Sequence, residues 1–243
     1  MERRRGLRTV EDMRDERVAL VTGASRGLGL ALARALAERG WALVLDARGA
    51  EALTAATSEL EGLTTVRAVA GDVADEAHRL ALRDAVDDLG RLDALVHNAS
   101  VLGPSPQPAL ADYPLDAFEQ VLAVNLVAPL RLTQLLVGRL GPGGRIVSVT
   151  SDAAVEAYAG WGGYGASKAA LEQLTAVLAV ERPDLAVHRY DPGDMRTQLH
   201  QEAFPGEDIS DRPPPEQSVP GLLALLEGRH PSGRYTSAEL VPA

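Results

Sequence analysis

The chain has 243 residues, a length that fits one α/β domain, and we predict no second domain. Its 34 acidic and 24 basic residues give a formal net charge of −10, which disfavours a nucleic-acid backbone as a partner. There is no cysteine, so disulfides, thiolate zinc sites and cysteine nucleophiles are excluded. Redox chemistry in this chain would need a cofactor.

The first 16 residues are polar and charged, and they hold no apolar run of the length that a signal peptide requires. We predict a mobile N-terminal extension over residues 1–16, with a docking arm as the alternative, and one domain over 17–243. No later segment is interpreted as a membrane span. The expected protein is therefore cytoplasmic, with neither a membrane nor a nucleic acid as partner.

Short apolar segments alternate with helical patterns rich in alanine and leucine. The predicted strands are 18–22, 42–45, 65–69, 94–97, 145–150 and 186–190. The predicted helices lie near 28–39, 50–60, 75–89, 115–140 and 164–181. Each predicted helix is long enough to form a right-handed crossover between two parallel strands. We therefore predict an α/β fold with a doubly wound parallel sheet of the Rossmann type.

The alternation stops between Asp194 and Glu216, where the sequence becomes polar and rich in proline. We predict a loop near 194–215, which is either a lid over a substrate or a plain surface excursion. After it, the segment from Gly221 to Glu227 predicts a short helix, and the segment from Arg234 to Val241 predicts a last strand.

A glycine-rich turn joins the first predicted strand to the first helix, with the sequence Thr22-Gly23-Ala24-Ser25-Arg26-Gly27-Leu28-Gly29. Glycines at such a turn let the backbone approach a ligand, and free amides at the start of the helix favour a pyrophosphate. Taken alone, the turn is equally consistent with tight packing.

The glycine spacing resembles that of the short-chain dehydrogenase/reductase family in its ordinary, non-extended branch. Further motif positions follow in the order and spacing of that family: Asp72-Val73, Asn98-Ala99, Asn125, Ser151, Tyr164, Lys168, Pro192-Gly193 and Thr197. The resemblance covers the chain from about Val18 to Thr197. It implies an enzyme that transfers a hydride between a nicotinamide dinucleotide and a carbonyl or secondary alcohol.

Tyr164 and Lys168 are four residues apart in a predicted helix, so their side chains lie on one face. An adjacent ammonium favours the tyrosinate, and we expect it to lower the pKa of Tyr164 towards neutrality. Tyr164 is then the acid in reduction and the base in oxidation, while Ser151 hydrogen-bonds the substrate oxygen. The alternative is a surface pair, but Lys168 is the only lysine among 24 basic residues, which argues for a specific role.

The resemblance adds Asn125 to the catalytic set, where we expect it both to hold a water that links the lysine to solvent and to brace a helix against a strand. It also implies a set of cofactor-binding residues. These are Gly23, Ser25, Arg26, Gly27, Leu28, Gly29, Arg48, Asp72, Val73, Asn98, Ala99, Tyr164, Lys168, Pro192, Gly193, Met195 and Thr197. No metal site is predicted, because the five histidines form no ligand-spaced pair.

The end of the second strand, Leu45-Asp46-Ala47-Arg48, bears on the choice between NADP and NAD. An acid there accepts hydrogen bonds from the adenosine ribose, whereas an arginine admits a 2′-phosphate. By resemblance the discriminating position is Ala47, so Arg48 and Arg26 favour NADP(H). Asp46 leaves NAD open, and Arg48 has the alternative of a solvated loop side chain.

Two departures from the family pattern affect the site. The fourth strand ends in His97-Asn98-Ala99-Ser100, where Ser100 replaces a glycine and could weaken cofactor affinity, while His97 is expected to be a packing residue. The glycine-rich ending that is usual in the family is replaced by Pro231-Ser232-Gly233-Arg234-Tyr235. The subunit contacts of the family therefore carry over less directly to this chain. We expect a homodimer or homotetramer, and helices 115–140 and 164–181 are the candidates for pairing the subunits, although their apolar residues would equally serve the core.

Tyr158, Trp161 and the stretch from Met195 to Phe204 are expected to border the substrate pocket, which suggests a partly apolar ketone or alcohol. The main alternative is a nonenzymatic NADP(H)-binding sensor or scaffold, against which the intact set of motif residues argues. An epimerase or dehydratase of the extended branch would show another glycine spacing.

Overall fold

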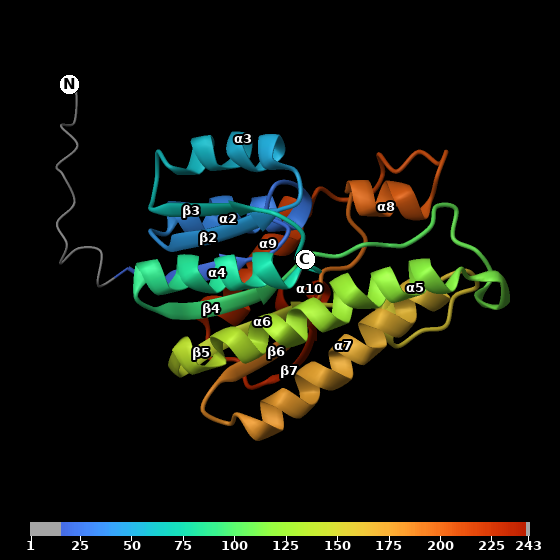
Figure 1. Ribbon diagram of the computed structural model, residues 1–243. Helices are drawn as coiled ribbons and strands as arrows, with labels where there is room; N and C mark the ends of the chain where they lie inside the picture. Colours follow the sequence, from blue (N-terminus) through green and yellow to red (C-terminus); the bar gives the residue numbers. More distant parts are fainter. Residues whose placement is uncertain (1–15, 242–243) are drawn as a thin grey trace.

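A seven-stranded parallel sheet forms the centre of the molecule, as a computed structural model of residues 16–241 shows (Figure 1). Its strand order is β3-β2-β1-β4-β5-β6-β7, and every neighbouring pair is parallel. The strands are β1 (Val18–Val21), β2 (Ala42–Ala47), β3 (Val66–Ala70), β4 (Leu92–His97), β5 (Leu140–Val149), β6 (Ala186–Asp191) and β7 (Gly233–Thr236). The predicted extension over residues 1–16 lies outside the described residues apart from Glu16.

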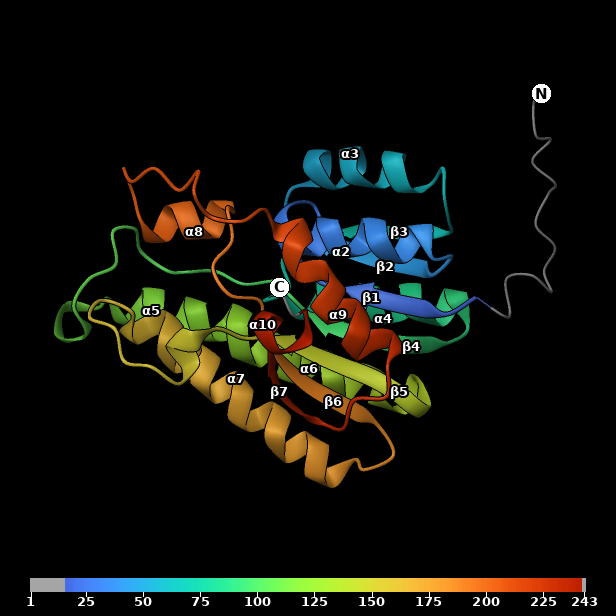
Figure 2. The ribbon, with the colours of Figure 1, turned by 180° about the vertical axis from the view of Figure 1, so that it is seen from behind.

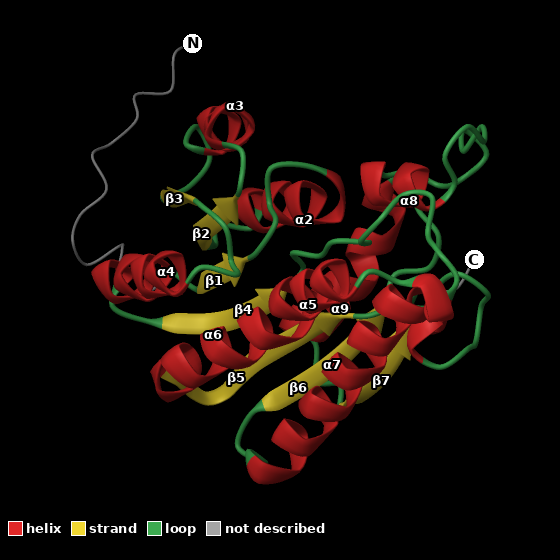
Figure 3. Cartoon of the chain, turned by 45° about the vertical axis from the view of Figure 1, so that its right-hand side comes forward, coloured by secondary structure: helices red, strands yellow, loops and turns green. Residues whose placement is uncertain are grey.

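Helices cover both faces of the sheet, which confirms the doubly wound architecture. They are α2 (Gly27–Glu38), α3 (Ala50–Leu60), α4 (Glu76–Leu89), α5 (Leu115–Leu122), α6 (Ala128–Leu136), α7 (Gly162–Glu181), α8 (Gln198–Ala203), α9 (Val219–Glu227) and α10 (Ser237–Leu240). Helices α4, α5, α6 and α7 lie on the face seen in Figure 1, and α2, α3 and α9 lie on the other, seen from behind in Figure 2. The strands between the two layers run in one direction (Figure 3).

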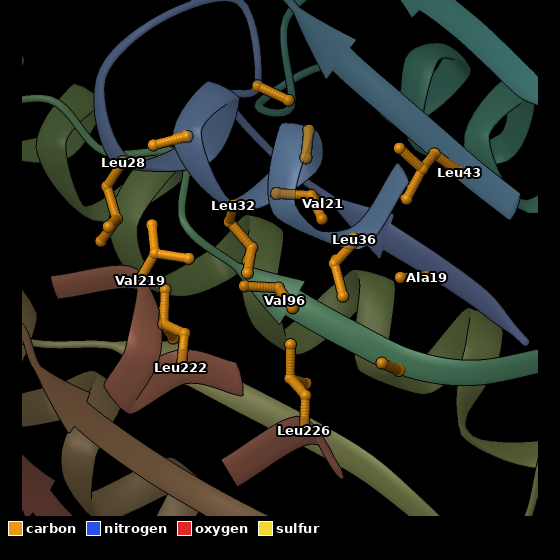
Figure 4. Close-up of a cluster of buried hydrophobic side chains, with 14 of the residues drawn as sticks. Ala19, Val21, Leu28, Leu32, Leu36, Leu43, Val96, Val219, Leu222 and Leu226 are labelled. Atoms are coloured by element: carbon orange, nitrogen blue, oxygen red, sulfur yellow. The ribbon is translucent and has the colours of Figure 1, made fainter. Parts of the chain in front are cut away.

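The core follows the alternation of strand side chains. Ala19 and Val21 of β1 belong to the cluster under α2 and α9, whereas Val18 and Leu20 face α4 and α6. Figure 4 shows leucines of α2 meeting those of α9 next to β1 and β4. Burying one leucine side chain stabilises the fold by about 1.5–3 kcal/mol. The two clusters together therefore hold the strands in place, and with them the strand ends from which the site is built.

The predicted helix over 115–140 is interrupted by a π-helical turn at Ala123–Val127, between α5 and α6. The amide of Ala128 bonds the carbonyl of Ala123, five residues back. Pro129 lacks the amide hydrogen that a regular helix would donate to the carbonyl of Asn125. Such turns are frequent at functional sites, and this one carries a predicted site residue.

By length and composition the helical run Leu115–Arg139 is apolar enough to cross a membrane, although we predicted no membrane span. In the fold, 44% of its most apolar window is buried. Leu132 and Leu136 pack in the core beneath β4 and β5, and Val121 and Val124 are buried as well. Much of its apolar character therefore serves packing against the sheet.

Two strand predictions were wrong by more than two residues at a boundary, while the others agree with the structure within that limit. Strand β5 begins at Leu140 rather than Arg145. The segment from Arg234 to Val241 is not one strand, because β7 ends at Thr236, whose side chain caps α10 in a capping box with Glu239. The proline-rich loop 194–215 contains the short helix α8, which the sequence pattern did not indicate.

Candidate active site

A cavity of about 910 Å³ opens at the carboxyl ends of the strands. It lies where the strand order reverses, because β1 has β2 on one side and β4 on the other. Ligands of open α/β sheets bind at this point. The turns after β1, β2, β3, β4, β5 and β6, together with the first turns of α7, contribute to its wall.

The glycine-rich turn is packed tightly against the end of β4. Gly23 has a φ of +67°, and a Cβ there would come within 2.9 Å of the Cα of Ala99. A Cβ at Gly29 would collide with the carbonyl oxygen of Gly23. The side-chain Nδ2 of Asn98 donates to the backbone carbonyls of Thr22 at 2.7 Å and Gly23 at 3.1 Å. These glycines are therefore required by packing, and the packing brings the turn to the cavity.

Gly27 serves the cavity rather than the packing. Its φ is +55°, a left-handed conformation that favours glycine. A Cβ there would only touch the side chain of Thr197, at 3.6 Å. Gly27 also begins α2 and lines the cavity, so the positive end of the helix dipole faces the space in which a phosphate would lie.

Asp46 is turned into the protein. It is 1% exposed; one carboxylate oxygen accepts from the Gly23 amide at 2.6 Å, and the other lies 3.0 Å from Nε2 of His78 on α4. Since both oxygens have protein partners, the carboxylate braces the glycine-rich turn. No sequence signal pointed to His78 as the partner.

Arg26 and Arg48 both line the cavity. The guanidinium of Arg26 donates to Oε1 of Gln198 on α8, which ties the glycine-rich turn to the loop 194–215. Arg48 is exposed directly after β2. Residues Asp194 to His200 also line the cavity, so this part of the loop borders the site.

Ser151, Tyr164 and Lys168 line the same cavity. Tyr164 is in the first turn of α7 and is 6% exposed, and Lys168 is one turn further on and 2% exposed. Nζ of Lys168 donates to the carbonyl of Val149 at 2.9 Å and lies 5.5 Å from the centre of the Tyr164 ring. The pair is buried, so the alternative of a surface pair is wrong.

Burial dominates the electrostatics of this pair. It raises the pKa of Tyr164 well above 10, against the lowering effect of hydrogen bonds with Ser100 and Ser151. It lowers the pKa of Lys168 to about 8. The expectation that the pKa of Tyr164 lies towards neutrality is not met by these protein groups, because burial dominates that pKa and Nζ of Lys168 is directed at a backbone carbonyl.

Ser151 follows β5, and its hydroxyl donates to Oδ1 of Asp152 at 2.8 Å. The other Asp152 oxygen accepts from the hydroxyl of Tyr158 at 3.0 Å. Asp152 lines the cavity, and its position beside Ser151 was the one signal in the sequence that could have found it. Tyr158 itself is 46% exposed and is not part of the cavity wall, contrary to expectation, whereas Trp161 is.

Asn125 lies behind the cavity wall and is 1% exposed. Its Oδ1 accepts from the amide of Val101 at 2.9 Å and the hydroxyl of Ser100 at 3.2 Å. Its Nδ2 donates to the carbonyl of Val101 at 2.9 Å and to Oγ of Ser167 at 3.0 Å. The side chain therefore braces the π-helical turn against the segment after β4 and against α7.

Most of the predicted site residues line this one cavity. They are Gly23, Ser25, Arg26, Gly27, Leu28, Arg48, Asp72, Val73, Asn98, Ala99, Ser151, Tyr164, Lys168, Pro192, Gly193, Met195 and Thr197. Gly29 and Asn125 stand behind it. His97 is buried with its Nε2 3.0 Å from the hydroxyl of Thr133, in agreement with a packing role.

The model of the short chain dehydrogenase family matches residues 17–208. The chain belongs to this family. Among its relatives is the oxidoreductase YciK of Escherichia coli strain K12, which is 32% identical over 240 residues that cover 94% of each chain. The predicted family and fold are thus confirmed, and the short chain dehydrogenase described here is an NAD(P)-dependent oxidoreductase.

Two solved structures show the same arrangement of the chain. A short chain dehydrogenase from Pseudomonas syringae is 32% identical with a TM-score of 0.85, covering 91% of this chain and 94% of that one. A short chain dehydrogenase from Shigella flexneri 2a, in complex with NADP, is 29% identical with a TM-score of 0.83, covering 91% of this chain and 96% of that one.

Proposed function

We propose that this short chain dehydrogenase transfers a hydride between NADP(H) and a small carbonyl compound or secondary alcohol, with Tyr164 as the acid and base. One observation carries the proposal. The buried Tyr164 and Lys168, with Ser151 beside them, share a single cavity with the glycine-rich turn. A proton donor and a phosphate-binding turn are the two parts that such a reaction needs.

The residues fit a dinucleotide with a 2′-phosphate. The helix start at Gly27 and the close approach of Gly23 to Ala99 would hold the pyrophosphate, and Arg26 and Arg48 would hold the 2′-phosphate. The Asp46 carboxylate is already paired with the Gly23 amide and with His78. It is therefore not directed at the position where the 2′-phosphate would lie. The NADP complex of the relative from Shigella flexneri supports the same preference. When bound, the nucleotide supplies or accepts the hydride.

The proton moves through the side chains of α7 and the end of β5. The hydroxyl of Tyr164 gives its proton to the carbonyl oxygen in reduction and takes it back in oxidation. Lys168, held by the Val149 carbonyl, stabilises the tyrosinate that forms. Ser151 exchanges its bond to Asp152 for one to the substrate oxygen, where negative charge develops. Asn125 holds the segment around Ser100 and Val101 in place.

The substrate would lie between Tyr164 and helix α8. Trp161, Leu199 and Ala203 give this part of the wall an apolar character. Arg196, His200 and Glu202 add polar groups from the same loop. A partly apolar ketone or secondary alcohol fits this wall, with the loop 194–215 as the substrate loop. We also propose a cytoplasmic location and assembly as a homodimer or homotetramer.

Nucleotide binding tests this proposal. NADPH and NADH are titrated separately into the protein, with nicotinamide fluorescence as the readout. Because a hydrogen bond to a charged group contributes about 1.5–3 kcal/mol, Arg48→Ala should weaken NADPH binding about 10- to 100-fold and leave NADH binding nearly unchanged. The matched control is Arg67→Ala, a variant of an exposed arginine on β3 outside the cavity wall. If neither nucleotide binds saturably, the proposal fails.

A further inference from the structure

Arg234 of β7 reaches back from the end of the chain to the active site. Its Nε donates to Oε1 of Glu172 at 2.9 Å, and its Nη2 donates to Oδ2 of Asp191 at 2.9 Å. The same Nη2 lies 3.4 Å from the carbonyl oxygen of Ser151. From the sequence, this region was noted only because it departs from the glycine-rich ending that is usual in the family.

Each partner of Arg234 adjoins a residue with a proposed role. Glu172 is one turn beyond Lys168 on α7, and it also accepts from the hydroxyl of Thr150 at 2.8 Å. Asp191 ends β6, and its other oxygen accepts from the amide of Gly193 at 3.0 Å. One guanidinium thus connects β5, β6, β7 and α7 beside the cavity.

Arg234 is also the cation that faces two buried carboxylates. Glu172 and Asp191 are each 7% exposed, so leaving either without its partner would be costly. The negative charges of Asp191 on β6 and of Asp152 after β5 both oppose ionisation of Tyr164 and raise its pKa. Glu239 of α10 is a further carboxylate, whose pKa is lowered mainly by hydrogen bonds with Thr236 and further by the charge of Arg234.

We propose that Arg234 is a positioning residue of the active site: it holds the ends of β5 and β6 against α7 and offsets the charges of Glu172 and Asp191 next to Tyr164 and Lys168. This inference rests on the proposed roles of Tyr164 and Lys168. Through it, the last strand of the sheet sets the electrostatic environment of the proton-transfer pair, without contact between Arg234 and the reacting atoms.

The single lysine makes a direct test possible. In protein labelled with ¹³C- and ¹⁵N-lysine, the one side-chain NMR signal belongs to Lys168, and its titration gives the pKa of that group. Neither nucleotide nor substrate is needed. In the wild type, burial lowers this pKa to about 8.

Three variants give expected shifts of opposite sign. Arg234→Gln leaves the carboxylates less compensated, which favours the ammonium and should raise the pKa of Lys168 by about 0.5–1 unit. Asp191→Asn removes one negative charge and should lower it. In the double variant the two effects should largely cancel. A purely structural role of Arg234 would not produce opposite shifts that cancel.

Arg182→Gln is the matched control, because Arg182 pairs with Asp184 just beyond the far end of α7 and should not affect the pKa of Lys168. An unchanged pKa of Lys168 in both single variants overturns the proposal, as do shifts in the same direction. If circular dichroism shows that Arg234→Gln is unfolded, Arg234→Met, which keeps most of the side-chain volume, takes its place with the same expected rise in the pKa of Lys168. Lack of turnover with the expected shifts present would contradict the proposed function and not this inference.

Discussion

Burial of the Lys168 side chain lowers the stability of the fold. A buried ammonium with one hydrogen bond, to the carbonyl of Val149, is poorly compensated for the water that it loses. The lowered pKa of about 8 records this cost. Asp46 shows the opposite case, since its buried carboxylate is compensated by the Gly23 amide and by His78.

Lys168→Met should therefore stabilise the protein near neutral pH, by about 1–3 kcal/mol. The pKa is about 8 in the folded chain against 10.5 for an unperturbed lysine, so the folded form binds fewer protons between these values. Wild-type stability thus rises with pH across this window, and the advantage of the variant is greatest below pH 8 and shrinks towards 10.5. Urea unfolding at several pH values measures this, and a variant less stable than wild type at neutral pH would contradict it.

At the scale of the elements, strand β6 contains a histidine that is buried without a hydrogen-bond partner among the described residues. His188 is 0% exposed, and within residues 16–241 neither of its ring nitrogens has a hydrogen-bond partner. Its ring packs edge-on against that of Tyr235, with centroids 5.8 Å apart. Burial lowers the pKa of His188 to about 4, so it stays neutral in the fold and binds a proton when the chain unfolds below about pH 6.5.

His188→Phe should flatten the acid side of the stability profile. Because the folded form binds fewer protons than the unfolded chain between pH 6.5 and 4, wild-type stability falls as the pH drops through this window. The variant lacks this dependence and should gain about 1–3 kcal/mol relative to wild type near pH 4.5. Unfolding free energies measured between neutral and acid pH test this; profiles that stay parallel would speak against it.

At the element scale the sequence predicted much of the architecture, because strand and helix periodicities are local. The motif residues could be assigned to one site because parallel strands end at the same edge of the sheet. The contact between Asp46 and His78 and the hydrogen bond from Arg234 to Glu172 could not be predicted. The two residues of each pair are 32 and 62 positions apart in the chain, respectively. The π-helical turn was missed because its pattern is as apolar as a regular helix.

At the scale of the whole molecule, apolar side chains remain exposed on two helices of one face. Val127 is 48% and Leu130 of α6 is 38% exposed, while Val177 and Val180 of α7 are 44% and 81% exposed. These helices lie on the same side of the sheet (Figure 1). Burying such a surface against a second copy would remove it from water, so we predict that α6 and α7 form the subunit interface.

The double variant Val177→Glu/Val180→Glu should dissociate the assembly, since burying unpaired carboxylates in an apolar interface is unfavourable. Sedimentation equilibrium should give a dimer or tetramer for wild type and a monomer for the variant. Leu63→Glu, at an exposed leucine between α3 and β3, is the matched control. A monomeric wild type, or a variant with unchanged mass, would contradict the predicted interface.

The most direct test of the central claim is NADPH consumption with a panel of small ketones and aldehydes, measured for wild type, Tyr164→Phe and Tyr235→Phe. The last is a control, because the Tyr235 hydroxyl bonds the carbonyl of Pro231 outside the cavity wall. We expect turnover by wild type and Tyr235→Phe, and a loss of about 10²- to 10⁴-fold in Tyr164→Phe. Undiminished turnover by Tyr164→Phe would contradict it, as would NADPH binding without turnover of any carbonyl compound, which would indicate a nucleotide-binding scaffold.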